Sequence, residues 1–440
     1  MPQATPSGLP SQVKSGARVA LFLLLSINLF NFIDRQVLAA VESDIEMDFF
    51  PEEEYPFHPG TKNRVDPNIE GWMGSLNFAF MVSYMVFAPL FGWMADRMKR
   101  WFLVGVGVTV WSLASGATGL APTFAVLFLT RCMVGIGEAA YGPVAPTVIS
   151  DMYPLRQRGQ MLAWFYVAIP VGSALGYVLG GGIAKLTGDW RWSFLSVVPP
   201  GVALGVWCFL MPETPRGQAD ADVPTSKPRL KDYLLILHNP SFVLNTLGMT
   251  ALTFAMGGIS FFMPRYIALE RGAGDKATVN VVFGGIVAVS GLGATILGGL
   301  AGDWLKPRFS GAYFLVSAIA MFIGFPMVLL VLWLPFPLAW VFVFLACFCL
   351  FFNTGPTNTI TANVIHPSVR ASAFALNILV IHALGDAVSP TIIGLVKGYT
   401  ESWAVAFGVV SGMFLLAGIF WLWGVKYLDR DTARVSGSAC

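Results

Sequence analysis

The stretch GPVAPTVISDMYP at residues 142–154 has a second copy, GPTNTITANVIHP, at residues 355–367. In both copies the proline of a Gly-Pro pair precedes another proline by eleven residues, and the copies lie 213 residues apart. The same offset relates four further pairs of residues, which are Gly172 and Gly385, Gly181 and Gly394, Trp190 and Trp403, and Phe194 and Phe407. The chain therefore contains two parallel copies of one half.

The composition indicates a protein whose surface lies mostly in lipid. The chain has 440 residues, of which 55% are hydrophobic and 12% are charged, and its mean hydropathy is +0.67. A soluble domain of this length cannot bury so much apolar surface in one core. The net charge of +2 offers no basic stripe for a phosphate backbone, so we expect no nucleic-acid partner.

Twelve apolar segments are long enough to cross the roughly 30 Å of hydrocarbon in a bilayer. They lie near residues 17–41, 69–95, 101–120, 122–148, 161–185, 190–211, 241–266, 278–302, 310–333, 337–365, 373–398 and 403–425. The sequence predicts an all-α membrane protein with twelve transmembrane helices in two six-helix pseudo-symmetric halves. Such halves imply a cavity between them and alternating access to its two sides.

Five consecutive regions follow from these segments. They are a cytoplasmic tail (1–16), a six-helix bundle (17–211), a cytoplasmic linker (212–240), a second six-helix bundle (241–425) and a cytoplasmic tail (426–440). With both termini inside, the inner segments carry 17 Lys and Arg and the outer segments carry 8, while Arg35 and Arg131 lie in the membrane. Basic residues concentrate on the cytoplasmic side of membrane proteins, so both termini are predicted to be cytoplasmic.

A charge cluster follows the second span in the sequence GWMADRMKRW, residues 92–101. It resembles the loop signature G-x-x-x-D-R-x-G-R-R of the major facilitator superfamily. The positions that match are Gly92, Asp96, Arg97 and Arg100, whereas Lys99 and Trp101 depart from the signature. The resemblance implies the major facilitator fold.

The second half repeats part of this cluster at Gly299 and Asp303. A carboxylate beside a helix end is able to hold two spans together through nearby arginines and to release them on opening. We therefore expect a gating latch, formed by Asp96, Arg97, Arg100 and Asp303.

The fourth span carries RCMVGIGEAAYGP, residues 131–143, which matches the superfamily pattern R-x-x-x-G-x-G at Arg131, Gly135 and Gly137. An arginine inside a span is costly unless it is paired or wetted, so Arg131 is a functional candidate. The alternative is a purely structural buried ion pair.

Four motifs together resemble the Spinster family over nearly the whole chain. They are NFIDRQ (31–36), GIGEAAYGP (135–143), AIPVGSALGYVLGG (168–181) and IHALGDAVSPTIIG (381–394). The resemblance implies an exporter of lysolipids and sphingoid lipids such as sphingosine 1-phosphate, linked to protons in some members. The short termini suggest a bacterial member in the inner membrane.

The charged residues of the first half suggest a proton-coupling site. Asp34 is expected roughly 10 Å below the outer end of its span and Arg131 roughly 13 Å below the outer end of another, so the two are at similar depth and able to pair. Glu138 lies two turns further in on the same face as Arg131, and it is either the alternative proton carrier or the group that faces a cationic part of the cargo. A contact between Asp34 and Arg131 that is made in one conformation and lost in another would couple protonation to access.

Other polar residues are candidates for substrate binding. Arg35 is about 100° around the helix from Asp34, so the two need not face the same way, and if Arg35 faces the cavity it is the expected partner of a phosphate. His382 and Asp386 share one helix face, which is compatible with either packing or titration. The remaining candidates are Asn28, Tyr84, Tyr166, Asn353 and Asn358.

A charged first half facing a Phe- and Met-rich second half fits an amphiphile better than a sugar. The expected partners are thus an amphiphilic lipid, protons and the bilayer, and the chain is expected to act as a monomer. An alternative cargo is a small organic anion, taken up with protons and clamped by Arg35 or Arg131.

Catalysis and metal chemistry are not expected. The sequence contains neither H-E-x-x-H nor G-x-S-x-G, and its four histidines are scattered. Cys347 and Cys349 are two residues apart on a predicted helix and point to nearly opposite sides, so they cannot share a metal. A channel would require rings of like residues or carbonyl filters, whereas the paired latches favour alternating access. We expect neither a cofactor nor an enzyme.

Overall fold

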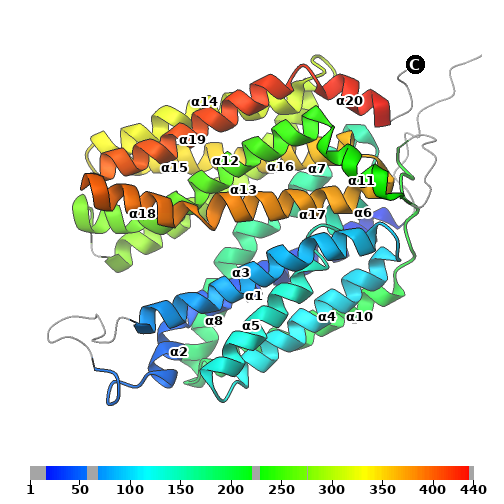
Figure 1. Ribbon diagram of the computed structural model, residues 1–440. Coiled ribbons are helices and arrows are strands. Elements are labelled where there is room, and N and C mark those ends of the chain that lie inside the picture. Colours follow the sequence, from blue (N-terminus) through cyan, green and yellow to red (C-terminus); the bar gives the residue numbers. More distant parts are fainter. Residues whose placement is uncertain (1–15, 57–67, 221–227, 275, 436–440) are drawn as a thin grey trace, which may run out of the picture. The chain divides into compact units, whose positions relative to one another are not determined.

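The computed structural model describes residues 16–56, 68–220, 228–274 and 276–435, and these residues form helices and connections without strands (Figure 1). The helices before the linker are α1 (Ala17–Ala40), α2 (Glu42–Phe49), α3 (Asn68–Ala95), α4 (Arg100–Gly119), α5 (Phe124–Ala139), α6 (Ala145–Met152), α7 (Leu155–Tyr166), α8 (Ala168–Thr187), α9 (Arg191–Leu195) and α10 (Val198–Leu210).

The helices after residue 227 complete the fold. They are α11 (Leu230–Leu237), α12 (Pro240–Arg265), η1 (Tyr266–Glu270), α13 (Lys276–Leu305), α14 (Ala312–Trp333), α15 (Ala339–Phe352), α16 (Thr354–Val364), η2 (Pro367–Val369), α17 (Arg370–Ile381), η3 (His382–Asp386), α18 (Ser389–Thr400), α19 (Trp403–Gly424) and α20 (Leu428–Val435).

Eleven helical segments of the described residues are long and apolar enough to cross a membrane. The twelfth expected span, residues 122–148, is divided between α5 and α6. Gly142 and Pro143 lie in the break, where proline has no backbone N–H to donate to a continuous helix. The repeated Gly355-Pro356 pair instead lies in the first turn of α16, where proline is tolerated, and α15 ends just before it at Phe352.

The chain divides into two compact units that do not follow the two halves of the sequence. The N-terminal unit comprises Leu23–Val144 and Ala168–Pro212, and the C-terminal unit comprises Met1–Phe22, Ala145–Val167 and Glu213–Cys440. Helices α6 and α7 thus belong to the first half by sequence and pack with the second. The expected division into bundles separated by the linker 212–240 stays a prediction.

In the N-terminal unit, α5 packs against both α3 and α4, and α4 also packs against α10. Two glycines of the R-x-x-x-G-x-G pattern explain how closely α5 approaches its neighbours. A Cβ atom on Gly135 would collide with the carbonyl of Phe80 and the hydroxyl of Ser83 on α3. A Cβ atom on Gly137 would lie 2.7 Å from the backbone nitrogen of Trp111 on α4. The pattern therefore places Arg131 and Glu138 beside α3 and α4.

Gly135→Ala is expected to lower the midpoint of thermal unfolding, because the added methyl group forces α5 away from α3. Overpacking of a close contact costs about 1–3 kcal/mol. Gly181→Ala is the matched control, since a Cβ atom there meets nothing within 4 Å and alanine is the better helix former. Equal midpoints for the two variants in detergent would contradict this packing.

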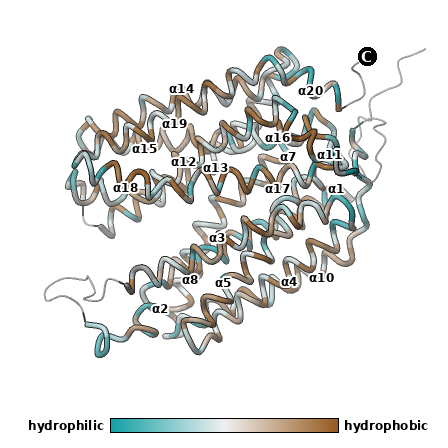
Figure 2. The backbone as a smooth tube through the Cα atoms, viewed as in Figure 1, coloured by the Kyte–Doolittle hydropathy of each residue, from teal (hydrophilic) through white to brown (hydrophobic). Residues whose placement is uncertain are grey.

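In the C-terminal unit, α19 packs against α12 and α14, and α15 packs against α13 and α14. Figure 2 shows that these long helices are predominantly hydrophobic, whereas α20 is hydrophilic. Helix α7 packs against α13 and α16, where Ala163, Gly299 and Gly355 meet. A Cβ atom on Gly355 would lie only 3.1 Å from the Cα atom of Gly299. Small residues from both halves therefore allow this approach.

Candidate functional site

The N-terminal unit contains an ion pair between Arg35 of α1 and Glu138 of α5. The Nη2 and Nε atoms of Arg35 lie 2.5 and 2.7 Å from Oε2 of Glu138. The Arg35 side chain is 20% exposed and the Glu138 side chain 1%. Arg35 thus pairs with a carboxylate of the protein in this structure, and its role as the partner of a phosphate stays a prediction.

Aromatic rings surround the Arg35 guanidinium. Its central carbon lies 5.0 Å from the ring centroid of Phe32, 4.9 Å from that of Phe80 and 5.2 Å from that of Tyr84. These distances are typical of cation–π contacts, which gain strength where water is excluded. The candidate residue Tyr84 therefore lies in the same cluster as Arg35 and Glu138.

Arg131 of α5 also lies near this cluster and is 1% exposed. Its central carbon is 5.5 Å from the ring centroid of Phe80, so one ring lies near two guanidinium groups. Among the described residues, the Nε and Nη1 atoms of Arg131 have no hydrogen-bond partner. Two buried donors are thus available to an anion.

Asp34 does not form the expected ion pair with Arg131 in this structure. Its Oδ1 atom accepts a hydrogen bond from the hydroxyl of Ser115 on α4, and its Oδ2 atom has no partner among the described residues. The side chain is 2% exposed. Asp34 and Arg35 diverge because successive residues of a helix point about 100° apart. Asn28 is on the same helix, two turns before Arg35, and is 4% exposed.

The C-terminal unit brings two other candidates into direct contact. The hydroxyl of Tyr166 on α7 donates a hydrogen bond of 2.9 Å to Oδ1 of Asn358 on α16. Asn353, the residue directly after α15, is fully buried and donates to the carbonyl of Cys349. The hydrogen bond between Tyr166 and Asn358 therefore connects a helix of the first half of the sequence with a helix of the second half.

His382 and Asp386 lie on one face, as their spacing predicts. The Nδ1 atom of His382 is 3.0 Å from both carboxylate oxygens of Asp386. Both residues lie in the π-helical segment η3, where Gly385 leaves helical geometry at φ −103° and ψ −105°. A Cβ atom on Gly385 would meet Thr253 of α12, which explains glycine at this kink.

The four latch residues lie at the ends of spans in both units. Asp96 and Arg100 are buried between α3 and α4, and the guanidinium of Arg97 lies 4.4 Å from the ring of Trp93. In the C-terminal unit, Asp303 accepts hydrogen bonds from the backbone N–H of Gln160 and the hydroxyl of Tyr313. The Asp303 carboxylate thus accepts a hydrogen bond from the backbone of α7, a helix of the first half of the sequence.

A buried ion network was not among the sequence predictions. It joins the four charged residues Asp151, Arg158, Asp220 and Arg370 in the C-terminal unit. The repeat contained a signal for the two arginines, because each follows the repeated proline of its half, Pro154 or Pro367, by four or three residues. Ser115 and Phe80 had no comparable signal, since serine and phenylalanine are ordinary residues of a span.

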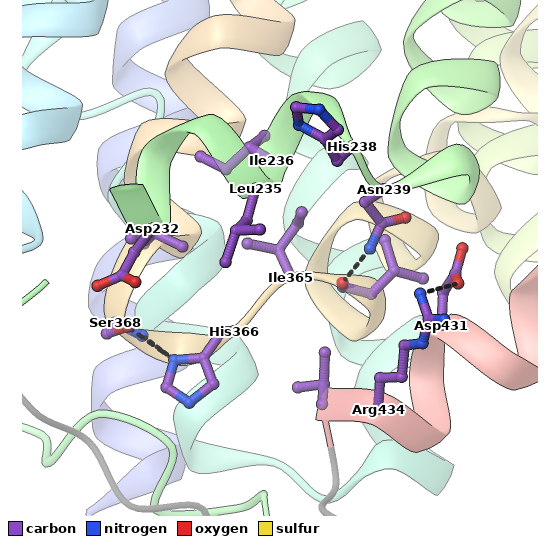
Figure 3. Close-up of a pocket in the computed structure, with 13 residues that line it drawn as sticks. Asp232, Leu235, Ile236, His238, Asn239, Ile365, His366, Ser368, Asp431 and Arg434 are labelled. Atoms are coloured by element: carbon purple, nitrogen blue, oxygen red, sulfur yellow. Dashed lines mark hydrogen bonds and ion pairs between the residues drawn. The ribbon is translucent and has the colours of Figure 1, made fainter. Parts of the chain in front are cut away.

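A pocket of about 480 Å³ lies at the ends of α11, α16 and α20 in the C-terminal unit (Figure 3). The figure shows His366 bonded to Ser368, and Asn239 donates to the carbonyl of Val364. Asp431 accepts from the backbone and hydroxyl of Ser241. These polar groups satisfy one another, and the pocket contains no sequence-predicted candidate, so we assign no ligand to it.

Residues 24–390 match the Major Facilitator Superfamily. The chain is 32% identical to Protein spinster homolog 3 of Danio rerio over 94% of this chain and 86% of that protein. It is 33% identical to Protein spinster homolog 1 of Homo sapiens over 96% and 83% of the two chains.

Solved structures share the fold at low sequence identity. A bacterial homologue of the human lysosomal transporter Spinster, described as inward-facing and unoccupied, has a TM-score of 0.58 and 19% identity over 97% of this chain and 99% of that one. The human organic anion transporter MFSD10 (TETRAN) has a TM-score of 0.72 and 15% identity over 94% and 100%. The shared fold agrees with the superfamily match and with the sequence relatives. The chain is therefore a multi-pass membrane protein that belongs to the major facilitator superfamily and, within it, to the Spinster family.

Proposed function

We propose that this chain is a proton-coupled secondary transporter that exports a lysolipid or a sphingosine 1-phosphate-like amphiphile. The observation that carries the proposal is the imbalance of contacts in the N-terminal unit. Asp34, Arg131 and Glu138 are buried and Arg35 is partly buried, and among these four described residues only Arg35 and Glu138 form an ion pair. Uncompensated charges in such surroundings are costly, so they favour binding of a proton or an anion.

Asp34 and Glu138 are the proposed proton carriers. When Arg131 approaches Asp34, the ionised carboxylate gains a counter-ion, and when the two separate, protonation removes the charge. Protonation of Glu138 would likewise release Arg35 from its ion pair. Either carboxylate thus links proton binding to the freedom of an arginine.

The released arginine is the proposed partner of the cargo's anionic head. Arg35 has five donors in a planar arrangement that suits a phosphate, and Arg131 already has two donors without partners. In the C-terminal unit, Tyr166, Asn358 and His382 are the proposed polar contacts. We propose that the protein works as a monomer in a bacterial inner membrane, with both termini in the cytoplasm.

Efflux of a labelled lysolipid from proteoliposomes tests this function. The parent is expected to move the lipid faster under a pH gradient, and Asp34→Asn and Arg131→Ala are expected to lose that acceleration. Glu53→Gln, in an exposed connection, is the control and is expected to transport like the parent. Gradient-independent lipid movement by the parent would contradict proton coupling.

The unpaired donors of Arg131 also favour a second candidate, symport of a small organic anion with protons. Competition distinguishes the two cargoes. Inhibition by long-chain lysolipids but not by short carboxylic acids supports the lipid, and the reverse result supports the organic anion. A well-folded parent that moves no lipid would rule out the lipid assignment.

A further inference from the structure

The hydroxyl side chains of α4 differ in what they contact. Those of Thr109, Ser112 and Thr118 each donate to the backbone carbonyl four residues earlier, at 2.7–3.0 Å. Such a bond satisfies a buried hydroxyl within its own helix. Ser115 instead donates to Oδ1 of Asp34 on α1, and among the described residues it makes no bond to its own helix. Its hydroxyl therefore serves a carboxylate of another helix.

Both partners of this hydrogen bond are buried in the N-terminal unit. Ser115 is 0% exposed and Asp34 is 2% exposed. A buried carboxyl oxygen that loses its donor is costly, because water does not reach it as a replacement. Removal of the Ser115 hydroxyl would therefore leave Oδ1 of Asp34 without a donor, as Oδ2 already is among the described residues.

Ser115 and Arg131 are two different kinds of partner for one carboxyl group. Among the described residues, the charged side chains that act on Asp34 are Arg131, Glu138 and Arg35. A guanidinium group favours the ionised acid, because it gains most from a negative charge. A neutral hydroxyl donates to a carboxylate and also to the carbonyl oxygen of a protonated acid. Ser115 is thus able to keep its bond in both protonation states of Asp34.

The two oxygens of Asp34 have different surroundings. Oδ1 accepts from Ser115, whereas Oδ2 has no partner among the described residues. Asn31, one turn earlier on α1 and 3% exposed, likewise has its Nδ2 atom without a partner in this part of the chain. Oδ2 is therefore the oxygen that is available to a proton. When the proton forms an O–H bond at Oδ2, Oδ1 becomes the carbonyl oxygen and still accepts from Ser115.

A second hydroxyl contact lies between the helices that carry Ser115 and Arg131. The hydroxyl oxygens of Thr118, one turn after Ser115 on α4, and Thr130, the residue before Arg131 on α5, are 2.9 Å apart. Helices α4 and α5 also pack against each other. The neutral and the charged partner of Asp34 thus lie on two neighbouring helices that are in direct contact.

We propose that Ser115 is a positioning residue for proton binding, which holds Oδ1 of Asp34 at α4 and apart from Arg131, so that Oδ2 accepts the proton. This inference rests on the proposed role of Asp34 as a proton carrier, and it does not depend on any cargo. It adds the partner that keeps the carboxyl group in place while the charge of the acid changes.

Infrared difference spectroscopy tests the bond between Ser115 and Asp34 directly. Spectra of the full chain in detergent are recorded on acidification from about pH 8 to about pH 4, a range over which buried carboxyl groups commonly take a proton. The C=O band of protonated Asp34 is the band that disappears in Asp34→Asn. A hydrogen bond to the carbonyl oxygen weakens the C=O bond, so this band is expected to shift to higher wavenumber in Ser115→Ala. In Ser115→Cys the thiol is a weaker donor, and the band is expected between the two positions.

Two further variants separate this bond from general effects of substitution. Ser112→Ala is the matched control, because Ser112 lies on the same helix, is 2% exposed and donates to the carbonyl of Val108. Its band is expected at the position seen in the parent. If Asp34→Asn does not fold, Asp34→Glu assigns the band instead, since the longer side chain displaces it.

An Asp34 band that stays at the parent position in Ser115→Ala would overturn the inference. The absence of an Asp34 band over this pH range would also overturn it, because the inference requires this side chain to take a proton. The spectra involve neither cargo nor a pH gradient, so they are independent of the efflux result. A shifted band without lipid movement would support the role of Ser115 and reject the proposed cargo, whereas an unshifted band with gradient-driven efflux would reject the role of Ser115 alone.

Discussion

Gradient-driven transport by Glu138→Gln is expected to fall at least about a hundredfold, because Arg35 loses the one carboxylate that pairs with it among the described residues. Glutamine has no titratable proton, so it removes any link between proton binding at this position and the freedom of Arg35. The measurement is the initial rate in proteoliposomes, with Glu53→Gln as the exposed control. A rate within about threefold of the parent would contradict the role of the pair.

A double variant separates the loss of the pair from the loss of one charge. Arg35→Gln combined with Glu138→Gln leaves no stranded charge, so its midpoint of thermal unfolding is expected to lie above the value that the two single variants predict by addition. Contacting residues typically deviate from additivity by about 0.5–3 kcal/mol. Strict additivity would show that the two side chains act independently.

Asp220→Asn is expected to lower the free energy of unfolding by about 3–5 kcal/mol at neutral pH, since Arg158 and Arg370 of the buried ion network remain buried without their shared counter-ion. Burial alone opposes ionisation of Asp220, but the Arg370 and Arg158 guanidinium groups outweigh it and hold the pKa of this carboxyl well below its ordinary value. The ionised carboxylate therefore stabilises the folded protein.

The pH dependence has a definite sign. A folded-state pKa below the unfolded value of about 3.9 gives stability that is fully present above that pH and is lost as the pH falls through the folded pKa. The difference between the parent and Asp220→Asn should thus be constant near neutrality and narrow below about pH 4. Thermal unfolding in detergent from pH 7 to pH 3 measures it, with Asp232→Asn as control. A difference that widens in acid would contradict the assignment.

The apolar segments and the repeat together predicted the helical membrane architecture, but not the division into compact units, in which α6 and α7 pack with the second half. The glycines and prolines at 142–154 and 355–367 fix where helices break and approach, because these residues act through backbone geometry that does not depend on distant partners. Gly299 and Gly355 pack against each other as such small residues do. The family followed from motifs of the same kind, confirmed by relatives at 32–33% identity.

Ion-pair partners were less predictable than the helices that carry them. Residue counts placed Asp34 and Arg131 at similar depth, but depth alone does not fix which carboxylate an arginine meets. Arg35 pairs with Glu138, 103 positions away, because the rotation of α1 directs it toward α5. The partners in the buried ion network were harder to predict than the Arg35–Glu138 pair, because Asp220 lies in a linker whose course no periodic pattern describes.

The two halves of the chain differ in charge at one position of the repeat, because Asp220 is present in only one of them. At the offset that relates the repeated residues, its counterpart is Ala433, so only the first copy supplies this acid. A symmetric dimer of two first halves would bring together two copies each of Asp151, Arg158 and Asp220, which places four carboxylates against two guanidinium groups. A homodimer of first halves would therefore have an excess of negative charge at this point, whereas the charges of the fused chain are balanced.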